Sequence, residues 1–226
     1  MEELIVISLI LLSLAIIYCF DKVFQKQGLY YALVLLNLIS FVLTFKIAYI
    51  LRTNINIGII PLLASFAIIY IYIVRYGNKE KNNIISISIY SNITFAILLA
   101  IMNFCIPTLT ETISINIKAT FETNYKILIL YPIIVLISQY AITKMYILVS
   151  KIQNNIFLSV ILTYIITALI YTIIFILFAY IKVLTIKDSI FVGVSTYIFG
   201  LIINLLITIF IYYVTKKKVK KWQIYY

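Results

Sequence analysis

Long apolar runs separated by short polar segments dominate the chain. Seven of them are close to the roughly 20 residues that a helix needs to cross the hydrocarbon core of a membrane. They cover residues 4–20, 29–51, 57–74, 84–106, 127–149, 156–181 and 189–214. Strands of a membrane barrel would be about ten residues long and would alternate apolar with polar. The pattern therefore predicts an all-α integral membrane protein, a polytopic bundle of about seven transmembrane helices forming one domain over residues 1–226.

Composition excludes an ordinary soluble domain. The chain is 65% hydrophobic and only 11% charged, whereas a soluble chain is about half apolar and a quarter charged. The first run could be mistaken for a secretory signal, but it starts with Glu2 and Glu3, and IIYCFDKVF (16–24) offers no small-residue cleavage site. We expect this run to be a helix of the mature protein.

Positive residues are distributed unequally between the two sets of loops. The loops after the first, third and fifth runs, with the C-terminal segment, hold twelve of them: Lys22, Lys26, Arg75, Lys79, Lys81, Lys144, Lys151, Lys216, Lys217, Lys218, Lys220 and Lys221. The opposite side holds six, together with five of the seven acids. Because the cationic side of a membrane protein faces the cytoplasm, we expect a multi-pass protein of the cytoplasmic membrane with its N-terminus outside.

The last twelve residues, TKKKVKKWQIYY (215–226), are predicted to form a basic cytoplasmic tail. A basic run can neutralise nucleic-acid phosphates. Directly after a membrane span, such a run more commonly fixes topology and contacts anionic lipid. We therefore expect the lipid bilayer as the partner and no nucleic acid, and we read the net charge of +11 as the same topology signal.

Little in the sequence supports catalysis. The chain has no His, the commonest general base and metal ligand. Cys19 and Cys105 spell neither a zinc motif nor a redox pair, and no Gly-rich phosphate loop is present. The acids fall at the ends of apolar runs or between them. We expect no enzyme activity, no catalytic residue, no metal site and no cofactor.

The apolar runs carry sparse polar residues at helical spacing. Thr163, Thr167 and Tyr171 recur every four residues and share one helix face, and Gln139 and Thr143 repeat this spacing. Other polar residues inside the runs are Asn37, Ser40, Thr44, Asn92, Asn103, Ser138, Tyr146, Tyr164, Asn204 and Thr208. One interpretation is hydrogen bonding between helices. The other is a cavity of amides, hydroxyls and aromatic rings that suits a neutral planar heterocycle.

Four stretches follow one another in the order KVFQKQGLY (22–30), FAIIYIYIVRYGNKEKNN (66–83), LISQ (136–139) and IYTIIFILFAY (170–180). Their order and spacing, over about 200 residues, resemble the VUT family of queuosine precursor transporters. The matching residues are Gly28, Leu29, Tyr30, Tyr76, Gly77, Lys79, Glu80, Ile137, Ser138, Gln139, Phe175, Ala179, Thr196 and Tyr197. The resemblance implies a six-helix transporter core, here preceded by an additional N-terminal helix.

The chain departs from the family at its buried charges. The corresponding positions are Tyr70, Val74, Lys126, Ile142, Tyr171, Gly200 and Ile207. Only Lys126 is still charged. Losing paired buried charges together can be neutral or stabilising, because the desolvation cost disappears with the attraction. The scaffold is kept, and either transport is lost or the site is rewritten for a less charged ligand.

These observations predict a membrane transporter that takes up a queuosine precursor (a 7-deazaguanine-type base such as preQ0, preQ1 or queuine) or a related small heterocycle. The residues expected to bind substrate are Tyr70, Gln139, Thr143, Thr167, Tyr171 and Asn204. One alternative is a substrate-binding membrane subunit of an energy-coupling vitamin transporter. Another is a degenerate membrane scaffold that transports nothing.

Overall fold

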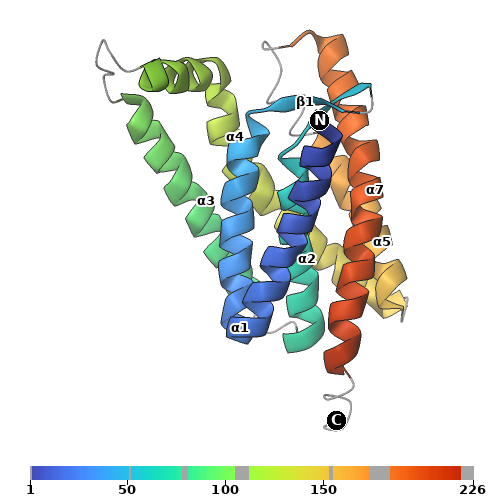
Figure 1. Ribbon diagram of the computed structural model, residues 1–226. Helices are drawn as coiled ribbons and strands as arrows, with labels where there is room; N and C mark the ends of the chain where they lie inside the picture. The colour runs from blue at the N-terminus through green and yellow to red at the C-terminus, as the bar shows by residue number, and fades with distance from the viewer. Residues whose placement is uncertain are drawn as a thin grey trace.

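The computed structural model describes residues 2–50, 52–77, 81–104, 112–152, 155–173 and 184–219 (Figure 1). These ranges contain six helices and one hairpin: α1 (Glu2–Thr44), β1 (Ile47–Ile50), β2 (Thr53–Asn56), α2 (Ile59–Tyr76), α3 (Lys81–Phe104), α4 (Thr112–Ile152), α5 (Ile156–Tyr171) and α7 (Ile186–Val219). Five of the helices are long and apolar enough to cross a membrane. The helical membrane architecture is as predicted, whereas the count of seven spans is not confirmed.

α1 contains both of the first two predicted spans. A straight helix of 43 residues would extend about 65 Å, roughly twice the thickness of the hydrocarbon core. Gln25 instead has non-helical angles, φ 51° and ψ −121°, and the two legs fold back beside each other there (Figure 1). Inside this turn, a Cβ on Gly28 would overlap the carbonyl oxygen of Phe20. Only glycine therefore allows the two legs to approach this closely.

The second predicted span, 29–51, is wrong at its C-terminal end. The helix stops at Thr44, and residues 47–56 form an antiparallel hairpin in which Ile47 lies opposite Asn56. The apolar run continues unbroken from helix into strand, so hydropathy does not mark the boundary. Asn56 Nδ2 donates to the carbonyl of Thr44 at 3.1 Å, and Ser40 Oγ donates to that of Gly58 at 2.7 Å. These bonds hold the hairpin against the end of α1.

α2 is the central helix of the bundle. Every residue from Ile59 to Ile73 is buried, and the helix packs against α1, α3, α4 and α7. A helix surrounded by protein has no face that must be polar, which explains its continuous apolar sequence. Pro61 lies in the first turn, as predicted, where its missing amide hydrogen costs little. Gly77, with φ 76°, ends the helix and donates its amide to Ile73 at 3.0 Å.

The remaining predicted spans lie in α3, α4, α5 and α7. α4 is far longer than the predicted 127–149, and its first part crosses one end of the bundle before the helix turns along it (Figure 1). α7 continues to Val219, so the predicted tail 215–226 begins inside a helix. α5 ends at Tyr171. The predicted segments 105–106, 174–181 and 220–226 lie outside the described residues.

The start of α1 and the end of α7 lie at opposite ends of the bundle (Figure 1). The turn of α1, with Lys22 and Lys26, shares one end with the C-terminal ends of α2 and α7, and the hairpin lies at the other end. The end that carries the turn of α1 thus holds Lys22, Lys26 and Arg75, three of the residues that the loop pattern groups together. The direction of the bundle in the membrane remains a prediction.

Candidate functional site

All six predicted substrate-binding residues point into the protein. Each of them is at most 4% exposed. They are Tyr70 on α2, Gln139 and Thr143 on α4, Thr167 and Tyr171 on α5, and Asn204 on α7. Each of these helices packs against at least one of the others. The polar groups of the spans are therefore shielded from lipid, as a site inside the bundle requires.

A polar stripe on α4 faces the central helix. Gln139, Thr143 and Tyr146 are spaced by four and three residues and are all buried, so they lie on one side of the helix. The ring of Tyr146 lies 5.4 Å from the ring of Tyr70 on α2, centroid to centroid. The structure therefore brings Tyr146, at one end of the stripe, together with Tyr70, and Gln139 lies two turns away on the same face of α4.

Gln139 is the most informative residue of this stripe. Its side chain is 0% exposed, and neither Oε1 nor Nε2 has a hydrogen-bond partner within the described residues. The hydroxyl of the adjacent Ser138 is also buried and has no hydrogen-bond partner within the described residues. An unmade hydrogen bond of this kind costs about 1–3 kcal/mol for each buried group. Native proteins keep few such groups, and each one calls for an explanation in terms of structure or function.

Tyr164 on α5 belongs to the same region, although it is not among the predicted binding residues. Its hydroxyl is buried and, like that of Tyr70, has no hydrogen-bond partner in the part of the chain that the structure describes. Tyr70 and Tyr197 lie near enough to Tyr164 to interact with it electrostatically. A Cβ on Gly200 of α7 would lie 2.6 Å from this hydroxyl. In the sequence, the feature that could have pointed to this space is Gly200, which has no side chain at a position where the family that the sequence resembles carries Lys.

The hydroxyl groups of the two predicted threonines, Thr143 and Thr167, donate hydrogen bonds within their own helices. Thr143 Oγ1 donates to the carbonyl of Gln139 at 2.8 Å, and Thr167 Oγ1 donates to that of Thr163 at 2.9 Å. Such bonds to the preceding turn leave only acceptor capacity on each hydroxyl. Tyr171 and Asn204 are buried on α5 and α7.

Polar residues on the other side of α2 connect helices. Asn37 Nδ2 on α1 donates to Ser88 Oγ on α3 at 2.7 Å, and the hydroxyl of Tyr131 on α4 donates to the carbonyl of Asn37 at 3.2 Å. Asn92 Nδ2 donates to the carbonyl of Ser88 at 2.8 Å. Asn37, Ser88 and Tyr131 therefore hydrogen-bond between helices, whereas the bond of Asn92 lies within α3.

A buried ion pair at the cationic end of the bundle was not predicted. Arg75 Nη1 lies 2.5 Å from Asp21 Oδ1, and the two side chains are 4% and 9% exposed. Arg75 Nη2 also donates to the carbonyl of Val214 at 3.0 Å. The pair thus joins the turn of α1 to the ends of α2 and α7. Its sequence signal was two opposite charges at the ends of spans predicted to finish on the same side of the membrane.

Lys144, a charge within a predicted span, does not face the interior. Its side chain is exposed, with Nζ 4.7 Å from the centre of the Tyr140 ring. A long cationic side chain near the end of a span can reach the interface in this way. It therefore contributes no positive charge to the region around Gln139.

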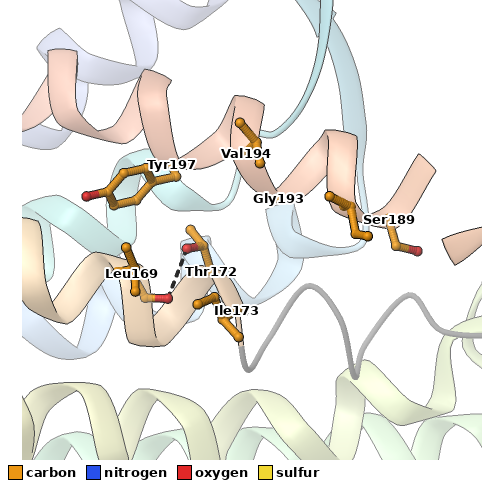
Figure 2. A pocket seen from close by; sticks show the side chains of 8 residues that line it. Leu169, Thr172, Ile173, Ser189, Gly193, Val194 and Tyr197 are labelled. Atoms are coloured by element: carbon orange, nitrogen blue, oxygen red, sulfur yellow. Dashed lines mark hydrogen bonds between the residues drawn. The ribbon is translucent and has the colours of Figure 1, made fainter. Parts of the chain in front are cut away.

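A pocket of about 230 Å³ lies between α5 and α7 (Figure 2). Leu169, Ile173 and Val194 form an apolar wall of this pocket. The hydroxyl of Thr172 donates to the carbonyl of Leu169 at 3.2 Å. None of the six predicted residues lines it. Thr172, Ser189 and Tyr197 also line it, but its surface is almost entirely apolar. Because a heterocycle needs several convergent polar groups to orient it, we do not assign the substrate to this pocket.

The candidate site is therefore defined by Tyr70, Tyr146 and Tyr164, which neighbour one another on α2, α4 and α5, together with Gln139 on the same face of α4 as Tyr146. It offers one free carboxamide and two free phenol hydroxyls, counted over the described residues. Comparisons of the chain with protein-family models, with curated proteins and with solved structures find no match.

Proposed function

We propose that this protein is a small membrane carrier that moves a queuosine precursor of the 7-deazaguanine type, or a related small heterocycle, across the cytoplasmic membrane. The resemblance of the sequence to the VUT family supports the substrate class. The observation that carries the proposal is the fully buried carboxamide of Gln139, whose two polar atoms have no partner among the described residues.

Gln139 differs from the other buried carboxamides of the spans. Asn37 and Asn92 each leave Oδ1 without a partner within the described residues but donate through Nδ2 at 2.7 to 2.8 Å, whereas both polar atoms of Gln139 lack a partner there. An unpaired carboxamide in the same protein lowers stability, and replacement by an apolar side chain would remove that cost. A group that is kept at such a cost is typical of a binding site.

The chemistry of the region suits a planar base. The rings of Tyr70 and Tyr146 lie 5.4 Å apart between centroids and are inclined by 58°, so the face of one ring or the other could stack on a flat ligand. The Gln139 carboxamide can donate and accept at once, and each tyrosine hydroxyl can do either. A heterocycle with an amide edge would satisfy groups that the protein alone leaves unpaired.

Uptake by cells tests the proposal. Cells that lack other salvage routes are given labelled preQ0, preQ1 and queuine, with and without this gene. We expect gene-dependent uptake of at least one base, reduced about tenfold or more by Gln139→Ala and by Tyr164→Phe, since each removes a directed hydrogen bond in a desolvated site. Tyr90→Phe is the control, because Tyr90 is 71% exposed on α3. Uptake that is unchanged across both site variants would remove this site assignment.

A further inference from the structure

The described interior offers a ligand no unpaired charge. Asp21 lies 2.5 Å from Arg75, and Arg75 also donates to the carbonyl of Val214. Lys144 is exposed. The groups that remain around the candidate site are a carboxamide and phenols, all neutral. Electrostatic recognition of a charged substrate would need an opposite charge that these residues do not supply.

Burial makes this lack of charge selective. A charged group that leaves water for a low-dielectric interior loses several kcal/mol of solvation unless an opposite charge compensates it. A neutral ring loses far less, because hydrogen bonds to amides and hydroxyls replace those to water. Two ligands that share a ring and differ only in the charge of one substituent should therefore bind very differently.

Gln139 provides the neutral recognition element. Both its acceptor Oε1 and its donor Nε2 are free within the described part of the chain. A lactam presents an N–H donor beside a C=O acceptor, which is the complement of a carboxamide. The hydroxyls of Tyr70 and Tyr164 add two further groups that accept or donate.

We infer that the site accepts uncharged, lactam-bearing aromatic rings and rejects charged derivatives of the same ring, with Gln139 as the specificity-determining residue. This inference rests on the proposed function and narrows its substrate class. Among bases of one scaffold, it selects those whose substituents are neutral at physiological pH.

Three probes with one ring test the inference. They are 7-cyano-7-deazaguanine, which is neutral, 7-aminomethyl-7-deazaguanine, which is a cation, and 7-carboxy-7-deazaguanine, which is an anion. Their dissociation constants are measured on the purified full-length protein in lipid nanodiscs. We expect the neutral base to bind about 100-fold or more tightly than either charged base. A charged base that binds as tightly as the neutral one would overturn the inference.

Gln139→Glu tests the residue itself. This change keeps the shape of the side chain and adds a carboxylate that can pair with an ammonium group. We expect the preference to move toward the aminomethyl base by at least tenfold. Gln27→Glu is the matched control, because Gln27 is exposed at the turn of α1. A folded Gln139→Glu protein with unchanged preference would overturn the role of Gln139, and if this variant does not fold, the wild-type comparison decides.

The outcomes separate the inference from the proposed function. If none of the three bases binds and none is taken up by cells, the proposed function fails and the inference fails with it. If the cation or the anion binds best, the carrier proposal survives and the inference alone is wrong. Tight binding of the neutral base alone supports both.

Discussion

Spacing along a helix can place polar residues on one face, but it cannot show what their hydrogens contact. The repeat of Thr163, Thr167 and Tyr171 predicted a buried face of α5, and all three are buried. The hydroxyl of Thr167 nevertheless donates to its own helix, a bond available to any threonine in a helix. Tyr164 was left out of the predicted binding residues, although its hydroxyl faces the space above Gly200. That relation depends on packing between α5 and α7, which no local pattern specifies.

At the level of the single residue, Gln139→Leu should stabilise the ligand-free protein. The change removes two unpaired polar atoms and leaves an apolar side chain of similar size, so the free energy of unfolding should rise by about 1–3 kcal/mol. Thermal denaturation of the purified protein in detergent measures this. In the same experiment, stabilisation by added base should disappear, because only a ligand that binds the folded form raises its stability. A less stable variant would mean that Gln139 has a structural partner.

Gly200→Ala should disturb Tyr164. The new Cβ would lie 2.6 Å from the tyrosine hydroxyl, so the ring must move, and we expect a loss of about 1–3 kcal/mol. Tyr164→Phe in the same chain removes the clashing oxygen and should restore most of that loss. The double-mutant cycle is measured by thermal denaturation. Equal losses in the single and double variants would show that the contact between α5 and α7 is not the cause.

At the level of the element, hydropathy located the helices well and their ends poorly. It predicted the course of α2 and the cores of α3, α4 and α7, but not that α2 is buried on all sides. It missed the hairpin after Thr44, because strand and helix share one continuous apolar run there. The reversal at Gln25 was foreseen only as a break between two spans. The break follows from membrane thickness, whereas the tight geometry depends on Gly28 next to Phe20.

The ion pair between Asp21 and Arg75 should act as a joint between elements. Asp21→Asn leaves a buried guanidinium without its counter-charge, and we expect a loss of about 3–5 kcal/mol. The double variant Asp21→Leu with Arg75→Met should recover much of it, since an apolar pair of similar volume avoids desolvation. Lys151→Met, at an exposed charge, should change stability by less than about 0.5 kcal/mol. Chemical denaturation compares the three variants, and a harmless Asp21→Asn would contradict this account.

At the level of the whole molecule, the fold shows which segments share an end of the bundle, and the loop charges predict which end faces the cytoplasm. We predict that the hairpin faces outward and that the end with Lys151 faces the cytoplasm. Single cysteines in place of Tyr49, which is 61% exposed, and Lys151, with both native cysteines replaced by Ser, report this through a membrane-impermeant maleimide. Labelling of residue 49 alone in intact cells is expected. Labelling of residue 151 alone would reverse the orientation.

Transport by the purified protein is the most direct test of the central claim that uncharged polar groups inside the bundle carry a neutral heterocycle. The protein is reconstituted into liposomes, and entry of labelled 7-cyano-7-deazaguanine is followed against empty liposomes and against the Gln139→Ala protein. The account predicts saturable entry for the wild type and at least a tenfold slower rate for the variant. Entry no faster than into empty liposomes, with correctly folded protein in the membrane, would contradict it.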